Sequence, residues 1–282
     1  MAASCGELNE GRNVHRADRG VNDIEAAHLR RRMETTASDP IQYSRQDPRR
    51  RDPSRLRCQR RTCREFHPVP EHQPSEAPFP FIDEHLLIAE KPAGLLAVPG
   101  RGEIGRVCLS ARVQEQVADA LIVHRLDMGT SGLMVFARGL PALRKLSLAF
   151  EQRRVSKRYV AVVDGWLDDD EGQIDAPLIA DWQARPRQII DHEIGKPSLT
   201  LWRVLAREPE RRTRLELTPV TGRSHQLRVH LASIGHPILG DGLYAAPAIT
   251  EAAPRMLLHA SALRVPHPVD GREMAFESPV PF

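Results

Sequence analysis

The sequence of 282 residues predicts an α+β domain with a large, mostly antiparallel β-sheet over residues 77–282. Short apolar runs rich in strand-forming side chains recur through this part, and polar or glycine-containing turns separate them. The clearest runs lie at residues 86–89, 133–137, 159–163, 199–205 and 214–217. Apolar side chains at helical spacing occur in three segments of this part, near residues 107–120, 141–154 and 224–234. Strands are therefore expected to outnumber helices.

Residues 1–76 have a different composition and predict a disordered, arginine-rich extension. Large apolar side chains are sparse between residues 41 and 76, and residues 45–64 alone contain nine arginines. Such a segment cannot bury enough apolar surface to offset the conformational entropy lost on folding. It is either a basic arm that binds RNA phosphates or an incidental extension without a role. Residues 24–33 are expected to form at most one or two amphipathic turns.

Composition excludes several classes of protein. Hydrophobic residues make up 41% and charged residues 27%, a balance typical of a folded globular protein. No apolar run is long enough to span a membrane, and residues 1–32 carry charges throughout. We therefore expect a cytoplasmic protein without a membrane anchor. The four cysteines, Cys5, Cys58, Cys63 and Cys108, lack metal-binding spacing and are expected to be free thiols.

The net charge of +3 comes from the extension. Of the 40 Lys and Arg residues 15 lie in residues 1–76, as do 12 of the 37 Asp and Glu residues, which leaves 25 of each sign in residues 77–282. The predicted domain is formally neutral, so any positive surface on it must arise from local clustering.

The segment His124-Arg-Leu-Asp-Met-Gly-Thr-Ser-Gly132 places one carboxylate, Asp127, on a loop of small residues before the apolar run 133–137. Small residues allow a substrate to approach closely. A lone carboxylate there can act as a nucleophile, a base or an electrostatic stabiliser. It can equally cap the turn through a backbone N–H group, as aspartate often does. The neighbours His124 and Arg125 favour a chemical role, because cations beside a carboxylate keep it charged.

A helix is predicted at residues 224–234, and Gly235 would end it. Either Thr221 or Ser224 is expected to cap its start. Its buried face is expected to carry Leu227, Leu231 and Ile234.

The first turn of this helix gathers Arg223, His225, Gln226 and Arg228. Because unpaired N–H groups and basic side chains meet there, we expect an anion site, with the first three residues binding substrate. Arg228 lies between two apolar residues and should be partly buried, so it requires a carboxylate partner. We expect that partner to be Asp127.

Together these segments resemble the RluA family of pseudouridine synthases, over residues from about 80 to 282. The motifs that carry the resemblance are His124-Arg-Leu-Asp-Met-Gly-Thr-Ser-Gly132, Arg158-Tyr159, Thr221-Gly-Arg-Ser-His-Gln-Leu-Arg-Val-His230, Gly235-His-Pro-Ile-Leu-Gly-Asp241 and Leu257-Leu-His-Ala260. Segments similar to the RluA subgroup within the family are Pro177-Leu-Ile-Ala-Asp-Trp182, Arg185-Pro-Arg-Gln188 and Gly195-Lys-Pro197. That subgroup lacks the S4 RNA-binding domain of many relatives, and none is expected here. The extension at residues 1–76 departs from the subgroup.

The resemblance implies a pseudouridine synthase fold with the catalytic cleft across the sheet. It implies an isomerase that detaches uracil from C1′ of a uridine, rotates it and rejoins it through C5. The uridine would be flipped out of an RNA stem-loop to reach the cleft. The implied substrates are the anticodon stem-loop of tRNA and one hairpin of 23S rRNA. The implied enzyme uses no metal or cofactor and acts as a monomer.

The resemblance also assigns roles to residues. Asp127 matches the catalytic aspartate, which either attacks C1′ or abstracts a ribose proton to form a glycal. Arg228 matches the arginine that pairs with it, and Tyr159 matches the residue that stacks on the flipped base and is a candidate for the C5 proton step. Arg125 matches the side chain that fills the gap left by the flipped nucleotide, and Leu258 matches the apolar residue behind the uracil.

Three alternatives remain open. The fold could serve a non-enzymatic RNA chaperone in which Asp127 is structural, or a synthase restricted to one RNA class. A metal-dependent hydrolase is the third, although no HxH or HExxH grouping occurs in the chain. Its candidate ligands would be His124, His225, His230, His236 and His259.

Overall fold

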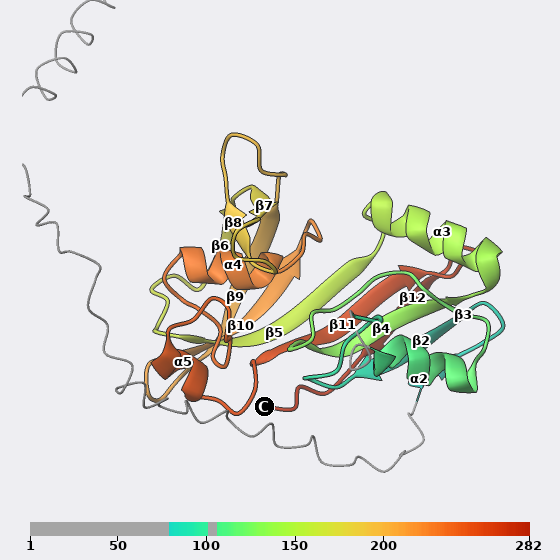
Figure 1. Cartoon of the computed structure of the whole chain (residues 1–282), viewed down its shortest axis with the longest axis horizontal. Coiled ribbons are helices and arrows are strands. Elements are labelled where there is room, and N and C mark those ends of the chain that lie inside the picture. Colours follow the sequence, from blue (N-terminus) through green and yellow to red (C-terminus); the bar gives the residue numbers. More distant parts are fainter. Residues whose placement is uncertain (1–78, 101–105) are drawn as a thin grey trace, which may run out of the picture. The chain divides into compact units, whose positions relative to one another are not determined.

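The computed structural model describes residues 79–100 and 106–282 (Figure 1). The predictions for residues 1–76, namely the extension, its amphipathic turns and its basic arm, lie outside the described residues, as do Cys5, Cys58 and Cys63. Cys108 is a buried free thiol, as expected. Within residues 79–100 and 106–282, no helix combines the length and the apolar character needed to cross a membrane.

A ten-stranded sheet forms the centre of the described part, with the order β1-β2-β4-β11-β5-β10-β9-β6, β3 paired to β4, and β12 paired to β11. Its strands are β1 (Phe81–Ile82), β2 (Leu86–Lys91), β3 (Ala120–Ile122), β4 (Ser131–Arg138), β5 (Ser156–Asp164), β6 (Glu171–Asp175), β9 (Leu199–Glu208), β10 (Arg212–Pro219), β11 (Leu258–Pro266) and β12 (Glu273–Glu277). Among the described pairs of strands, only β4 with β11 is parallel. The predicted α+β class with a mostly antiparallel sheet is confirmed.

Alternate residues of a strand point to opposite sides of a sheet, so a strand of continuous apolar residues has two faces to bury. Helices cover both faces here. On one face, Met134 and Phe136 of β4 belong to a core that also contains residues of α2 (Leu109–Gln116) and α4 (Gln226–Ser233). On the other face, Leu133 and Val135 pack with residues of α3 (Gly139–Glu151). In Figure 1, α2 and α3 lie towards one end of the sheet, and α4 lies near the other end with α5 (Pro247–Glu251).

The predicted strands and three helices are present, but several elements were not predicted. The missed elements are α5, β6, β11, β12 and the hairpin of β7 (Leu178–Ala180) and β8 (Gln188–Ile190), which forms a separate two-stranded sheet. The prediction for the helix at residues 107–120 was too long, since α2 ends at Gln116. Ala120 pairs with Arg138 in the sheet instead, so tertiary pairing overrides helical preference there.

The most consequential missed strand is β11, which lies between β4 and β5. Its first residues run parallel to the start of β4, with His259 opposite Ser131 and Ala260 opposite Gly132. Gly132 adopts a φ of +112°, and a Cβ atom at this position would meet the backbone of Ala260. This close approach brings the loop before β4 beside residues that follow it by about 130 positions.

Candidate active site

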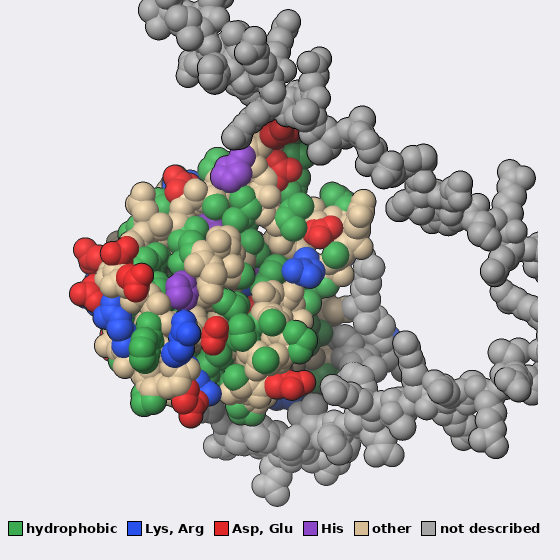
Figure 2. All heavy atoms as spheres, turned by 90° about the vertical axis from the view of Figure 1, so that its left-hand side faces the viewer, with side chains coloured by type: hydrophobic (Ala, Val, Ile, Leu, Met, Phe, Trp, Pro, Cys, Tyr) green, Lys and Arg blue, Asp and Glu red, His purple; other side chains and the backbone are tan. Residues whose placement is uncertain are grey.

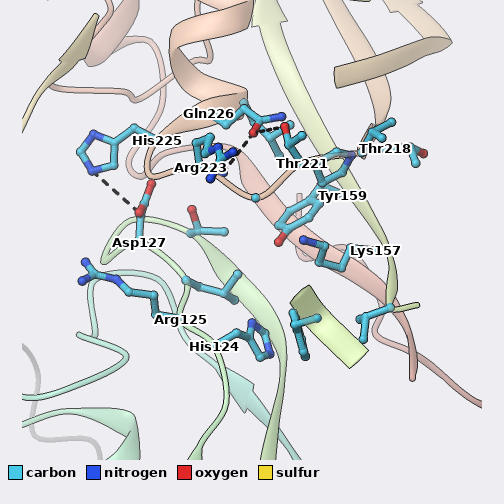
Figure 3. Close-up of a pocket in the computed structure, with 18 of the residues that line it drawn as sticks. His124, Arg125, Asp127, Lys157, Tyr159, Thr218, Thr221, Arg223, His225 and Gln226 are labelled. Atoms are coloured by element: carbon cyan, nitrogen blue, oxygen red, sulfur yellow. Dashed lines mark hydrogen bonds and ion pairs between the residues drawn. The ribbon is translucent and has the colours of Figure 1, made fainter. Parts of the chain in front are cut away.

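All eight residues expected to form the site line one cleft of about 750 Å³ (Figure 3). They are Arg125, Asp127, Tyr159, Arg223, His225, Gln226, Arg228 and Leu258. They come from four places in the fold: the loop between β3 and β4, strand β5, the start of α4 with the loop before it, and the start of β11. The cleft therefore opens where elements distant in sequence meet on the sheet.

Asp127 lies in the loop that leads into β4. The N–H of Thr130 donates to the backbone carbonyl of Asp127 at 3.1 Å, which closes the turn. The carboxylate is left to face side chains: Arg228 NH1 lies 3.4 Å from Oδ2, and His225 Nε2 lies 3.8 Å from Oδ1. The carboxylate therefore contacts two potential donors across the cleft, as a group held for chemistry would.

Arg228 has a second and closer carboxylate partner that the sequence did not identify. Its Nε and NH2 donate to the two oxygens of Asp241 at 2.7 and 2.6 Å, and both side chains are buried. Burial alone would lower the pKa of Arg228, but the hydrogen bonds and charge of Asp241 and the charge of Asp127 raise it. The guanidinium thus stays charged, with one nitrogen directed at Asp127.

Tyr159 and Leu258 form the apolar floor of the cleft. They lie on the neighbouring strands β5 and β11 and belong to the same buried core. Burial, and then the nearby charge of Asp127, raises the pKa of Tyr159 well above its ordinary value, so its phenol is neutral. A planar ring and a branched aliphatic side chain offer a flat, dry surface of the kind on which a base stacks.

The start of α4 differs from the prediction. Its N-cap is His225, in the left-handed region at φ +55°, and no side chain caps the helix; Ser224 is exposed. The predicted cap Thr221 instead donates to the side chain of Gln226. The helix is also buried on more sides than expected, whereas Ile234 is 39% exposed. The predicted caps were wrong because the Thr221 hydroxyl is bonded to Gln226 and Ser224 is exposed, and the prediction of a buried Ile234 was also wrong.

Gln226 shapes the loop that carries Arg223. Its Oε1 accepts hydrogen bonds from the Thr221 hydroxyl and from the N–H of Arg223, at 2.7 and 3.0 Å. Its Nε2 donates to Leu199 O and Thr200 Oγ1. The amide is therefore fully engaged within the protein, and Arg223 is left exposed at the rim of the cleft.

His124 does not act as a cation beside Asp127, contrary to expectation. Its ring stacks on Phe150 at 4.8 Å between centroids, and its Nε2 accepts the N–H of Val135 at 3.1 Å. Burial, followed by the charge of Lys157, lowers its pKa to about 3, so the ring is neutral. Arg125, the next residue, is exposed and carries its charge into the cleft.

Positive charge is concentrated in the cleft although residues 77–282 are formally neutral. The cleft is lined by two acidic residues, Asp127 and Glu151, and by five basic ones: Arg125, Arg153, Lys157, Arg223 and Arg228. On the face shown in Figure 2, by contrast, acidic and basic side chains are interspersed among apolar ones. Such local clustering suits a polyanionic substrate. Lys157 was not predicted as a site residue, although it lies two positions before Tyr159 on β5 and therefore points to the same side of the strand.

Lys91 binds the turn that carries Asp127, a role that was not predicted from the sequence. It is 1% exposed, and its ammonium donates to the carbonyls of Pro92, Leu95 and Met128 at 2.7–3.0 Å. Burial lowers its pKa to about 7, a shift that the charge of Asp127 opposes. The bond to Met128, the residue after Asp127, joins the end of β2 to the turn that carries Asp127.

The histidines considered as metal ligands each form hydrogen bonds with separate protein groups. His230 bonds Thr200 Oγ1 and Ala176 O, His236 bonds Asp164 O, and His259 lies between Ser131 and Ser278. In the part of the chain that the structure describes, no three His, Cys, Asp or Glu side chains are grouped to hold a metal ion.

Comparisons with known proteins agree with this geometry. A family model described as RNA pseudouridylate synthase matches residues 85–233. The dual-specificity RNA pseudouridine synthase RluA of Pasteurella multocida is 47% identical over 200 residues, which cover 71% of this chain and 91% of that protein. The RluA protein of Escherichia coli (strain K12) is 44% identical over 214 residues, covering 75% of this chain and 98% of that protein. Among solved structures, human RNA pseudouridylate synthase domain containing 1 is similar with a TM-score of 0.61 and 29% identity, covering 72% of this chain and 82% of that one.

Proposed function

This chain belongs to the family of RNA pseudouridylate synthases, isomerases that act on RNA, and we propose that Asp127 is its catalytic residue. The observation that carries the proposal is the position of the Asp127 carboxylate: it faces Arg228 and His225 in a cationic cleft with an apolar floor. A carboxylate in that place is ready to act on the ribose, either at C1′ as a nucleophile or on a ribose proton as a base.

We propose for the remaining residues the roles that the family resemblance assigns, and their positions in the cleft support these roles. Tyr159 stacks on the flipped uracil and is the candidate for the proton step at C5, since its phenol is neutral and within the same cleft. Leu258 lies behind the uracil. Arg125, exposed on the loop before Asp127, enters the gap that the flipped nucleotide leaves in the RNA. Unstacking the base costs a few kcal/mol, and such contacts offset that cost.

Two cations of the cleft bind the RNA backbone. Arg223 is exposed and Lys157 is partly buried, and neither has a carboxylate partner in the salt bridges of the described residues. His225 faces Asp127 from within the cleft, and Gln226 holds the loop of Arg223 in place. Phosphate contacts of this kind set affinity and orientation but carry no sequence information.

The substrates we propose are stem-loops: the anticodon stem-loop of tRNA and a hairpin of 23S rRNA. The relatives named above are dual-specificity enzymes, and the segments similar to the RluA subgroup include the β7–β8 hairpin. The enzyme would act as a monomer in the cytoplasm, where these RNAs occur, without a metal or cofactor. Incubation of each purified stem-loop with the enzyme, followed by mass-spectrometric mapping of pseudouridine, distinguishes dual from single specificity.

The variant Asp127→Asn tests the catalytic assignment. It keeps the size of the side chain but removes the negative charge, so pseudouridine formation should be abolished while the affinity for the stem-loop stays within a fewfold. Asp169→Asn, an exposed carboxylate in the turn before β6, serves as the control and should keep full activity. Turnover by Asp127→Asn would disprove the catalytic role of this residue. An RNA-binding protein in which the aspartate is structural would be indicated instead if the wild type bound the stem-loops but formed no pseudouridine.

A further inference from the structure

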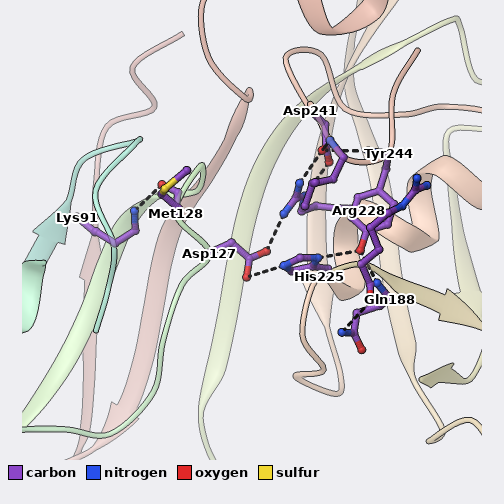
Figure 4. Close-up of polar contacts among 10 residues, drawn as sticks. Lys91, Asp127, Met128, Gln188, His225, Arg228, Asp241 and Tyr244 are labelled. Atoms are coloured by element: carbon purple, nitrogen blue, oxygen red, sulfur yellow. Dashed lines mark hydrogen bonds and ion pairs between the residues drawn. The ribbon is translucent and has the colours of Figure 1, made fainter. Parts of the chain in front are cut away.

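The two oxygens of Asp127 face two different side chains, and a single turn holds both of those side chains from behind (Figure 4). Arg228, near Oδ2, is bound through its fork by Asp241. His225, near Oδ1, is bound at Nδ1 by the hydroxyl of Tyr244 at 2.7 Å. Asp241 also accepts the backbone N–H groups of residues 243 and 244. The turn 241–244 is therefore one rigid support for both contacts of the carboxylate.

The hydrogen bonds of Tyr244 determine which nitrogen of His225 carries the proton. The backbone N–H of Gln188, on β8, can only donate, and it does so to the Tyr244 oxygen at 2.7 Å. The Tyr244 hydroxyl hydrogen is then free, and its acceptor among the described residues is Nδ1 of His225. If Nδ1 accepts, the neutral ring carries its hydrogen on Nε2, the atom directed at Asp127.

The surroundings of His225 favour a neutral, fixed ring. Its side chain is 8% exposed, and the edge of the Tyr244 ring packs against it with centroids 5.7 Å apart. Burial lowers the pKa of His225, and although the charges of Asp127 and Asp241 oppose this effect, the net direction is downward. Its backbone adopts φ +55°, a conformation that costs free energy and persists where the surrounding structure enforces it.

We propose that Tyr244 is a positioning residue that fixes the tautomer of His225, so that an Nε2–H group always points at Oδ1 of Asp127. This inference rests on the proposed catalytic role of Asp127. The separation of 3.8 Å is longer than a hydrogen bond, and a small movement when RNA enters the cleft would close it. Both Tyr244 and Asp241 lie beyond the segment 85–233 that the family model matches.

The tautomer matters because the alternative would repel the catalytic carboxylate. With the hydrogen on Nδ1, the lone pair of Nε2 would face an anionic oxygen, and the carboxylate would rotate away from its place. A neutral N–H donor instead orients the carboxylate without adding a second positive charge to that of Arg228. Tyr244 also receives its hydrogen bond from the β7–β8 hairpin, so the position of this hairpin is connected to Asp127 through two side chains.

The tautomer can be measured without any activity assay. Long-range ¹H–¹⁵N spectra of the full-length protein, with His225 assigned by the difference from a His225→Gln variant, report which ring nitrogen carries hydrogen. We expect a protonated Nε2 and an unprotonated Nδ1 in the wild type, and loss of this fixed state in Tyr244→Phe. A wild-type ring protonated at Nδ1, or an unchanged ring in Tyr244→Phe, would overturn the proposal.

Kinetics with a stem-loop substrate provide the second test. Tyr244→Phe keeps the ring and removes the hydroxyl, so kcat should fall by about tenfold, the rate equivalent of one hydrogen bond, with KM within about twofold. Thr250→Val is the matched control, since it removes a hydroxyl from α5 that bonds only backbone carbonyls of residues 241 and 246, and its kcat should not change. An unchanged kcat in Tyr244→Phe overturns this inference alone, whereas turnover by Asp127→Asn overturns the proposed catalytic assignment.

Discussion

At the scale of single residues, the site depends on how Arg228 divides its guanidinium between two acids. The planar fork binds Asp241 through two short hydrogen bonds and leaves NH1 for Asp127 at the longer distance of 3.4 Å. A bidentate pair of this kind is the geometrically specific one, and it fixes the plane of the guanidinium. Asp241 thus orients the guanidinium of Arg228, and the remaining nitrogen of that group pairs with the Asp127 carboxylate.

The variant Arg228→Ala should lower pseudouridine formation on the order of a hundredfold or more, with RNA still bound. The reason is that both Asp127 and the buried Asp241 lose their cation, so the variant should also be less stable to denaturant. Single-turnover rates and urea denaturation measure the two effects. Arg203→Ala, which removes an exposed guanidinium paired with Glu216, is the control and should match the wild type. A folded Arg228→Ala protein with near-normal rates would contradict the role of this ion pair.

The sequence located the residues of the site better than it located their contacts. That Arg228 would be buried and paired is confirmed, but spacing along the chain could not distinguish Asp127 from Asp241 as the closer acid. His124 was expected, together with Arg125, to be a cation beside Asp127, yet its ring is neutral and accepts a backbone N–H. Adjacent residues on an extended loop point to opposite sides, so adjacency in sequence gives no direction in space.

At the scale of elements, the close approach of β4 to β11 positions the loop that carries Asp127. Gly132 begins this contact, and its hydrogen in place of a side chain lets the backbone of Ala260 pack against it. The approach explains why residue 132 is a glycine. The small residues of this loop were expected to give a substrate access, whereas Gly132 makes room for the neighbouring strand.

Gly132→Ala should separate β4 from β11 and displace Asp127. The new Cβ atom would lie 2.6 Å from the backbone N of Ala260 and closer still to its carbonyl oxygen, at a φ that alanine disfavours. Gly235→Ala is the matched control, because Gly235 also has a positive φ of +84° but nothing within 4 Å of the added atom. We expect the control to lose about 1 kcal/mol of stability and to keep its activity, whereas Gly132→Ala should lose more stability and most activity. Thermal denaturation and initial rates compare the pair, and equal losses would contradict the packing role of Gly132.

At the scale of the whole molecule, buried neutral histidines make the fold sensitive to acid. His124 has its pKa lowered to about 3 by burial, and burial also lowers the pKa of His230 and His259. Below pH 6.5 the unfolded chain takes up a proton at His124 that the folded protein does not bind until about pH 3. The stability associated with this neutral ring is therefore complete above pH 6.5 and is lost progressively as the pH falls towards 3.

His124→Gln should flatten the stability profile in this window. The wild type is expected to lose up to about 1.4 kcal/mol of unfolding free energy per pH unit from this one histidine. Glutamine cannot titrate but can still accept the N–H of Val135. The variant should therefore lose less unfolding free energy than the wild type between pH 6 and pH 4. Urea denaturation at a series of pH values measures the slopes. Parallel profiles for the two proteins would show that His124 does not contribute.

Deletion of residues 1–76 should leave catalysis on a stem-loop intact. The relatives are matched over 91–98% of their own length by 200–215 residues of this chain, so their activity needs no counterpart of the remainder. Comparison of kcat/KM for the full and shortened chains, at low and moderate salt, tests this expectation. A large fall in kcat/KM for the shortened chain, greatest at low salt and smaller at moderate salt, would show that the arginine-rich arm binds the substrate.

Much of the domain could be predicted because its local patterns agree with its final contacts. Strands β2, β4, β5, β9 and β10 have apolar runs that a sheet buries, and all of them were expected. β11 was not predicted as a strand, because its apolar, polar and charged residues follow no clear period. Its neighbours β4 and β5 are also distant in sequence. Periodicity reports which side of a strand is buried, but it does not report which strand lies beside it.

Because β11 lies in the middle of the sheet, the sheet can be completed only late in the synthesis of the chain. Within the described sheet β4 and β5 are joined only through β11, so Asp127 belongs to one half of the sheet while Tyr159 and Arg228 belong to the other. A ribosome has therefore translated past Leu258 before the two halves can be united. A nascent chain halted earlier contains Asp127, Tyr159 and Arg228, the residues proposed to be catalytic, but lacks the strand that joins β4 to β5.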